Sequence, residues 1–149
     1  MTGAGRTGKF RAAEHWGVTP DIVAMSKGFG AGYAPLGAIV AAARLVEPVL
    51  DAGGFLHGFT YAGNPLACSA GLAVLEEMEE QGLIENAACM GEVLMDELRA
   101  LMDRYSFIGD VRGKGLLTAF EFVSDRSTME PLDPAINAHD RLVELAYAC

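Results

Sequence analysis

Two kinds of hydrophobic pattern divide the chain, with short apolar runs in its first third and helical spacing in its middle. The run at residues 23–25 is typical of a strand buried on both faces, and residues 36–42 form a second such run. Residues 11–16 predict a short helix that Gly17 ends, and residues 43–51 predict another. This order of strands and helices predicts an α/β fold.

Two longer helices are predicted in the middle of the chain. Asn64 can cap the free amides of a helix start and Pro65 fits the first helical position, so a helix is predicted from Pro65 to about residue 80. Its many small residues predict a core helix that neighbours approach closely. Gly82 ends this helix. A second, amphipathic helix follows, with apolar residues three or four positions apart at Ala87, Met90, Leu94, Leu98 and Leu101.

The last third of the chain returns to shorter elements. Residues 111–115 predict a tight turn, residues 116–123 predict a strand, and Asp133–Pro134 predicts the start of a final helix. We therefore expect two parts, residues 1–85 with strands and a small-residue helix, and residues 86–149 with a helix, a strand and a helix.

Composition and charge limit the partners. The formal net charge is −9, from 20 acidic and 11 basic residues. Without a basic cluster, nucleic acid is not an expected partner. The acids at residues 76–80 are interpreted as a solvated helix face. The longest apolar run, residues 34–43, is shorter than the roughly 20 residues that span a membrane. Three widely spaced cysteines argue against a disulfide framework or a zinc site and favour a reducing, cytoplasmic location.

Lys27 is the candidate catalytic residue, because it follows an apolar run and opens a stretch with glycines at positions 28, 30 and 32. An ammonium withdrawn from water must be paired or lose its proton, and the neutral amine is a nucleophile toward carbonyls. The glycines clear side chains from the space around Lys27, as the approach of a ligand requires. The alternative is that Lys27 merely enters solvent at the end of a strand.

Five short motifs, in order along the chain, resemble those of the class III aminotransferases, the ornithine, acetylornithine and omega-amino-acid group of pyridoxal phosphate enzymes. They are residues 5–8 (GRTG), 20–28 with SKG at its end, 35–38 (PLGA), 57–67 (HGFTYAGNPLA) and 111–116 (VRGKGL). The resemblance implies fold type I. Residues 1–85 would be the C-terminal half of the large domain, with a mixed, mostly parallel sheet and helices, and residues 86–149 an incomplete α+β small domain.

Pyridoxal 5'-phosphate is the cofactor that this resemblance implies. Lys27 would hold it in a Schiff base and then carry the proton between substrate and cofactor. Thr60 would donate a hydrogen bond to the cofactor phosphate across a homodimer interface, and Phe59 would lie beside it. The substrates would be an amino donor and a 2-oxo acid. His57 is interpreted as loop scaffold, and Arg6 and Arg112 as possible carboxylate partners, with a bracing role favoured for Arg112.

The resemblance also implies missing parts. The family's aspartate for the pyridine nitrogen precedes the motif at residues 5–8, so we expect the chain to be a fragment with little or no activity alone. A runner-up is an aminomutase or a decarboxylase on the same scaffold, which would keep Lys27 and Thr60. A third hypothesis is a non-catalytic fragment or a structural binding domain.

Overall fold

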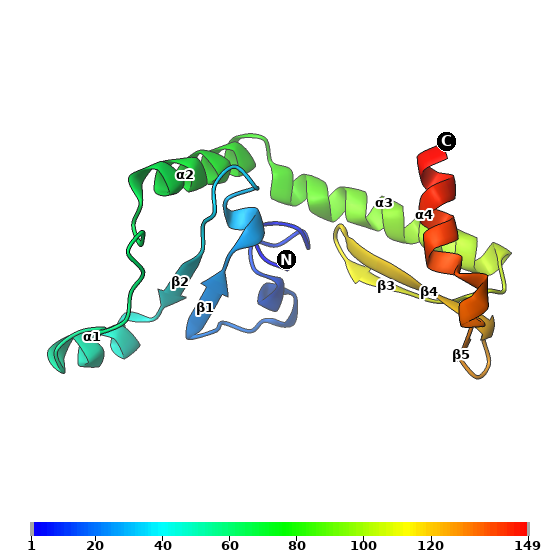
Figure 1. The fold of residues 1–149 in the computed structure, drawn as a ribbon, viewed down its shortest axis with the longest axis horizontal. Helices are drawn as coiled ribbons and strands as arrows, with labels where there is room; N and C mark the ends of the chain where they lie inside the picture. The colour runs from blue at the N-terminus through cyan, green and yellow to red at the C-terminus, as the bar shows by residue number, and fades with distance from the viewer. Residues whose placement is uncertain (1, 149) are drawn as a thin grey trace. The chain divides into compact units, whose positions relative to one another are not determined.

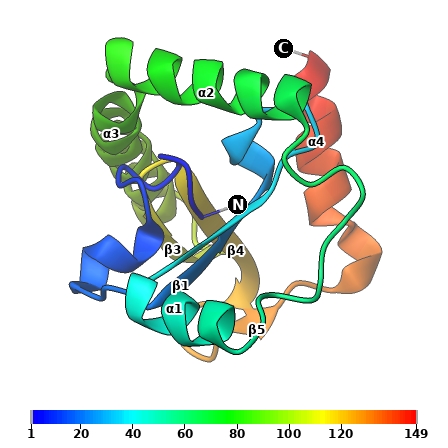
Figure 2. The same cartoon turned by 90° about the vertical axis from the view of Figure 1, so that its left-hand side faces the viewer.

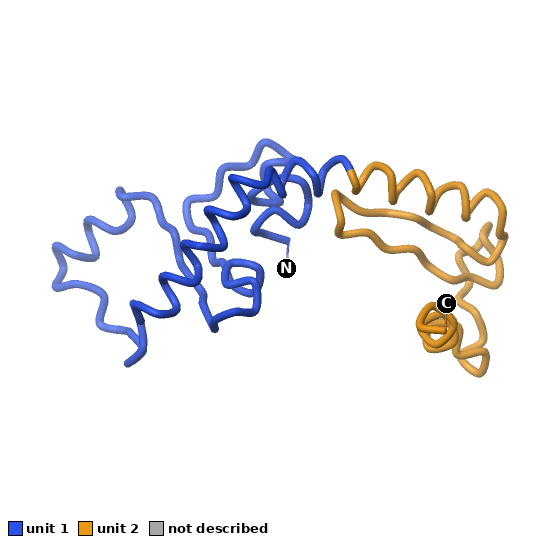
Figure 3. The backbone as a smooth tube through the Cα atoms, turned by 90° about the horizontal axis from the view of Figure 1, so that it is seen from above, with its two compact units in different colours: residues 1–89 blue, residues 90–149 orange. Residues whose placement is uncertain are grey.

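The computed structural model describes residues 2–148, and its chain forms two compact units, one ending at Cys89 and the next beginning at Met90 (Figure 3). In the first unit, the elements are η1 (Ala12–Trp16), β1 (Ile22–Met25), η2 (Lys27–Phe29), β2 (Ala38–Ala41), α1 (Ala43–Asp51) and α2 (Pro65–Glu80). Helix α3 (Leu83–Arg104) begins in the first unit and ends in the second. The second continues with β3 (Ile108–Lys114), β4 (Leu117–Asp125), β5 (Glu130–Pro131), η3 (Pro134–Ile136) and α4 (Ala138–Ala148).

The first unit is organised around a two-stranded antiparallel sheet. Strand β1 pairs with β2 so that Ile22 lies opposite Ala41 and Met25 opposite Ala38. Beyond the end of β1 the chain enters η2, and α2 lies past that end of the sheet in both views (Figures 1 and 2). Helix α1 follows β2 at the opposite end. The sheet thus delivers residue 27 to the side of the unit where α2 lies.

Helix α2 has the bounds that its capping residues predict. The Asn64 side-chain oxygen accepts a hydrogen bond from the Ala67 amide at 3.1 Å, and Pro65 occupies the first turn. The expectation of a core helix is wrong for the described residues, because among them Gly71 is the one residue of α2 that is buried. Small residues therefore mark a single close approach on this helix rather than burial along its length.

Strand β1 also differs from its expected environment. Its residues alternate between exposed and half-buried instead of lying buried on both faces. The physical reason is that β1 has a single partner strand among residues 2–148, and that sheet has only two strands. Burial on both faces requires covering layers that a short apolar run cannot reveal by itself.

The second unit packs part of α3 against an antiparallel sheet of order β3-β4-β5. Strands β3 and β4 form a hairpin in which Lys114 pairs with Leu117. The tight turn predicted at residues 111–115 is therefore wrong for Val111–Lys114, which are strand, and the turn lies at Gly115 and Leu116. Val123 is 1% exposed and Ile108 5% exposed, so the small core of this unit lies where the two strands meet.

The apolar side of α3 follows the predicted stripe in part. Ala87 is buried and Leu98 is half-buried, as predicted. Met90, Leu94 and Leu101 are exposed, and Gly91 and Met95 are buried in their place. The sequence contains two adjacent apolar stripes, and the sheet covers one of them. Spacing alone does not distinguish which stripe is covered.

The last helix begins later than predicted. The Asp133 carboxylate accepts a hydrogen bond from the Ala135 amide at 2.8 Å and caps η3, a single short turn. Asn137 then adopts a left-handed backbone with φ of 49°, which interrupts the helical path before α4 starts at Ala138. Within residues 2–148, none of the helices combines the length and apolar character needed to cross a membrane.

Arg126 fastens the C-terminal end of α3 to the sheet. Its guanidinium donates hydrogen bonds to the carbonyl oxygens of Ile108 at 3.0 Å and Tyr105 at 2.8 Å, and also to that of Met102. These carbonyls include ones that a helix end leaves without intrahelical donors.

We expect Arg126→Ala to lower the free energy of unfolding by about 1 kcal/mol. Arg99→Ala, which removes an exposed pair with Asp96, should change it by less than about 0.5 kcal/mol. Urea denaturation would measure both, and equal losses would contradict the role of Arg126.

Candidate active site

Lys27 adopts a backbone conformation that is rare for residues other than glycine. Its φ is 55°, in the left-handed region, which costs about 1–2 kcal/mol for an L-residue. The turn is held by two backbone hydrogen bonds, from the Phe29 amide to the Ser26 carbonyl at 3.3 Å and from the Gly30 amide to the Lys27 carbonyl at 3.0 Å. Strained residues of this kind persist where the surroundings fix them and are concentrated at functional sites.

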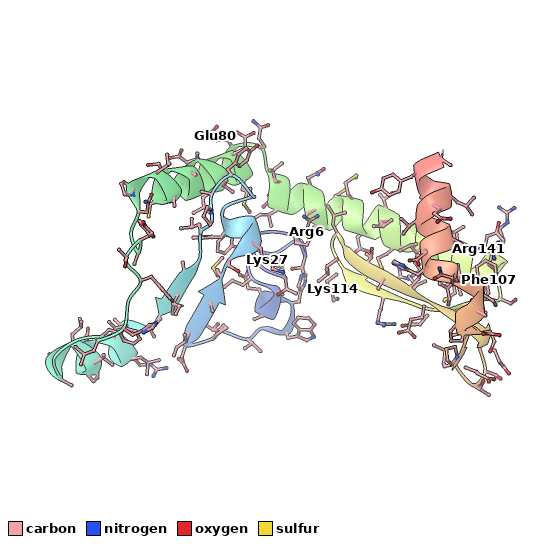
Figure 4. All side chains as sticks on the ribbon, in the orientation of Figure 1. Arg6, Lys27, Glu80, Phe107, Lys114 and Arg141 are labelled. Atoms are coloured by element: carbon pink, nitrogen blue, oxygen red, sulfur yellow. The ribbon has the colours of Figure 1, made fainter. Side chains whose placement is uncertain are left out.

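The Lys27 turn forms one wall of a groove of about 1480 Å³, which we call the Lys27 groove. Its walls come from residues 4–6, from residues 27–36 apart from positions 29 and 30, and from the side of α2 and the start of α3. Most of its lining residues are small or apolar, and Arg6, Lys27, Tyr33 and Glu77 supply side chains with polar groups. Figure 4 labels Arg6 and Lys27 in this part of the unit.

Lys27 is exposed in this structure. The expectation that it emerges from a strand buried on both faces is therefore wrong for the described residues, for the reason given for β1. Desolvation of the Lys27 amine is not provided by residues 2–148. Lys27 shares its left-handed backbone at the groove wall with Ala4 and Ala31, and of these three residues it is the one that carries an amine.

The glycines near Lys27 have different structural reasons. A Cβ at Gly30 would lie 2.5 Å from the Ala34 carbonyl oxygen, so backbone packing requires glycine there. Gly32 has φ of 83°, which favours glycine in any surroundings. A Cβ at Gly28 would lie 3.4 Å from the Ala4 Cβ, an ordinary contact. Two of the three glycines therefore serve the fold of the turn rather than clearing space for a ligand.

Thr60 and Phe59 lie in the segment between α1 and α2 and do not line the Lys27 groove. Both are exposed, Phe59 to 77%, and the Phe59 ring contacts the His57 ring edge to face with centroids 5.3 Å apart. In Figure 1 this segment is separated from η2 within the same unit. The described residues therefore do not bring Thr60 to the Lys27 of the same chain.

Arg112 is held by neighbouring carboxylates. It lies on β3, and its guanidinium donates to Asp110 at 2.5 Å and to Glu121 on the paired strand β4. These hydrogen bonds, first the one to Asp110, raise the pKa of Arg112. Its donors are engaged within the sheet, in agreement with the bracing role favoured from the sequence. Arg6 by contrast is exposed and lines the Lys27 groove.

Sequence reasoning missed two groove residues. Tyr33 was not considered, although an aromatic residue within a glycine-rich stretch is an available signal. Glu77 was assigned to a solvated helix face, and it is exposed as that interpretation predicts, but it also lines the groove. Among residues 2–148, no three His, Cys, Asp or Glu side chains gather closely enough to hold a metal ion.

Comparison with known proteins identifies the family. The family model described as aminotransferase class-III matches residues 1–143. The chain belongs to the class-III aminotransferase family. This membership confirms the resemblance drawn from the five motifs.

Curated relatives of this class-III chain differ in their named reactions. A leucine/methionine racemase from Thermococcus litoralis is 44% identical over 130 residues, which cover 87% of this chain and 28% of the racemase. A putrescine aminotransferase from Pectobacterium atrosepticum is 48% identical over 123 residues, which cover 82% of this chain and 26% of that enzyme.

A solved structure extends the comparison to the fold. An amine transaminase from an uncultivated Pseudomonas species, in its PLP-bound form, matches with a TM-score of 0.84 and 45% identity, covering 91% of this chain and 31% of the transaminase. The mixed α/β class is thus confirmed. The class-III chain spans less than a third of the length of each of these three proteins.

Proposed function

We propose that the full-length protein carrying this class-III sequence is a pyridoxal phosphate-dependent aminotransferase, which moves an amino group from an amine or amino acid to a 2-oxo acid. The observation that carries the proposal is the left-handed Lys27 at the wall of the Lys27 groove, in a chain of this family. The PLP-bound form of the similar transaminase supports the choice of cofactor.

The residues present fit this cofactor in part. Lys27 supplies a primary amine for its aldehyde, and the small residues at positions 28, 31, 32 and 34 leave the groove wall open beside that amine. Arg6 adds a cationic side chain to the same groove. When bound, pyridoxal phosphate supplies an electron sink that lets a bond to the substrate α-carbon break.

Lys27 has two roles in the proposal. Its Nζ would hold the cofactor covalently, and as a free amine it would accept the proton from the substrate α-carbon. A base must stay within hydrogen-bond reach of that proton throughout. The fixed turn that holds Lys27 meets this need better than a flexible loop would.

We further propose that the protein works as a homodimer with its active site at the subunit interface. Thr60 and Phe59 would serve the partner's cofactor, since they lie outside the Lys27 groove of their own chain. The segment that carries them also exposes the large apolar side chains of Phe55, Leu56 and Tyr61, and a protein contact would remove these from water. From the family membership we also propose that residues 1–85 belong to the large domain and residues 86–149 to the small domain. We propose that the enzyme is cytoplasmic.

A second candidate function is racemisation of an amino acid, which the Thermococcus litoralis relative favours. Both reactions would use Lys27 to move the α-proton, but only transfer moves nitrogen to an acceptor.

The test is to incubate the full-length protein, loaded with pyridoxal phosphate, with a ¹⁵N-labelled amine or amino acid and a 2-oxo acid. Label appearing in the new amino acid supports transfer. Inversion of the donor without movement of label would replace the proposal with racemisation.

Thr60→Ala should weaken cofactor binding. A hydroxyl that donates to a phosphate contributes about 1.5–3 kcal/mol, so the Kd for pyridoxal phosphate should rise by about 10- to 100-fold. Thr60→Ser keeps the hydroxyl and should stay close to the parent value. Fluorescence titration of the apoprotein would measure both, and an unchanged Kd in Thr60→Ala would contradict the assignment.

A further inference from the structure

We propose that Leu36 acts with Gly30 and Gly71 as a clamp that fixes the Lys27 turn against α2 and so positions the Lys27 amine. Leu36 and the two glycines would be positioning residues, because they act on Lys27 through its backbone. The inference rests on the proposed function of Lys27, although the clamp itself is a packing arrangement that is testable without cofactor.

The first half of the clamp lies within the turn. The buried Gly30 donates its amide hydrogen to the Lys27 carbonyl at 3.0 Å. A Cβ at Gly30 would lie 2.5 Å from the Ala34 carbonyl oxygen and 3.3 Å from the Leu36 Cβ. Gly30 is therefore packed directly against the segment that carries Leu36, and the hydrogen bond passes that restraint to Lys27.

The second half of the clamp lies on α2. Gly71 is buried, and a Cβ there would overlap the Leu36 Cδ2 atom and lie 3.7 Å from the Phe29 carbonyl oxygen. The Leu36 side chain thus occupies the space that the missing Gly71 side chain leaves. This is the one position of α2 that the described residues bury, so the helix holds the turn at this point.

The clamp gives a reason for the conformation of Lys27. A left-handed lysine relaxes unless its surroundings hold it. The Gly30 hydrogen bond closes the turn from one side, and Leu36 ties the same turn to a regular helix from the other. Loss of either contact would let the amine move, and a misplacement of about 1 Å can cost a reacting group about 100-fold in rate.

The test uses Gly71→Ala in the full-length protein, with Ser69→Ala as the matched control at an exposed position of the same helix. Both changes increase helix propensity, so propensity alone predicts no loss in either. The clamp predicts that in Gly71→Ala without cofactor, the Gly30 amide exchanges its hydrogen at least about tenfold faster, while Ser69→Ala does not change it. Covalent labelling of Lys27 by pyridoxal phosphate and borohydride, relative to labelling of Lys9, should fall by about tenfold in Gly71→Ala and should not change in Ser69→Ala.

A second variant makes the test specific to the clamp. Leu36→Ala removes the side chain that ties the turn to α2, so it should also speed exchange of the Gly30 amide and lower the labelling of Lys27. Because Leu36→Ala and Gly71→Ala break the same contact, the double variant should differ little from either single variant. Leu72→Ala, at an exposed leucine of α2, should leave both readouts unchanged. Unchanged Gly30 exchange in Gly71→Ala, or equal effects of Leu36→Ala and Leu72→Ala, would overturn the clamp. Absence of Lys27 labelling in the parent protein would instead count against the proposed function, with the exchange data still deciding the clamp.

Discussion

Lys27→Ala in the full-length protein is expected to lower kcat/KM for amino-group transfer by at least about 10³-fold. The variant loses both the amine that attaches the cofactor and the base that moves the substrate proton, and a positioned base alone contributes about 10²–10⁴-fold. Steady-state kinetics with a saturating 2-oxo acid would measure the loss. Thermal unfolding of the apoprotein should show no destabilisation, because alanine removes no buried contact of this exposed side chain.

Lys9→Ala is the matched control for this prediction. Lys9 is an exposed lysine of the same unit that does not line the Lys27 groove. Its removal should leave kcat/KM within about twofold of the parent value, as is usual for surface changes away from a site. Comparable losses in the two variants would show that the effect of Lys27→Ala does not come from catalysis.

Gly91→Ala should destabilise the second unit by at least about 2 kcal/mol, although alanine is the better helix former by about 1 kcal/mol. Gly91 lies on α3 where the hairpin turn approaches, and a Cβ there would lie 2.6 Å from the Gly115 carbonyl oxygen and overlap other backbone atoms of Gly115. Backbone atoms cannot move aside as the end of a flexible side chain can. The helix and the hairpin would have to separate.

Hydrogen exchange in β3 and β4 would measure this loss within the second unit. Glu92→Ala changes the next, exposed residue of α3 and should leave protection of the hairpin amides nearly unchanged. If Gly91→Ala protects these amides as well as the parent protein does, the contact between Gly91 and Gly115 does not limit the packing of α3.

Local signals explain which elements the sequence predicted well. Helix α1 has the predicted bounds, and α2 starts where Asn64 and Pro65 place it, because capping depends on neighbours in the chain. The strand at Val111–Lys114 was predicted as a turn, because its two glycines and charged residues are typical of turns. Its pairing with β4 overrides that local preference, and pairing is not visible in a short window.

The candidate site shows the same division. The position of Lys27 after an apolar run and its motif were readable from the sequence, but its left-handed backbone was not. In the proposed clamp, that conformation depends on the contact between Leu36 and Gly71, which lie far apart in the sequence. The groove residues Tyr33 and Glu77 come together with Lys27 only when α2 folds beside the turn. Burial of β1 was predicted wrongly because it depends on covering layers and not on the apolar run.

The central claim is that Lys27 is the residue that binds the cofactor. The most direct measurement is to incubate the full-length protein with pyridoxal phosphate, reduce it with borohydride, digest it and map the modified lysines by mass spectrometry. The amine bonds to the aldehyde carbon with loss of water, and hydride from borohydride fixes the bond. We predict near-stoichiometric modification of Lys27, with little at Lys9 or Lys114. Modification spread evenly over Lys9, Lys27 and Lys114, or absent from Lys27, would contradict the claim.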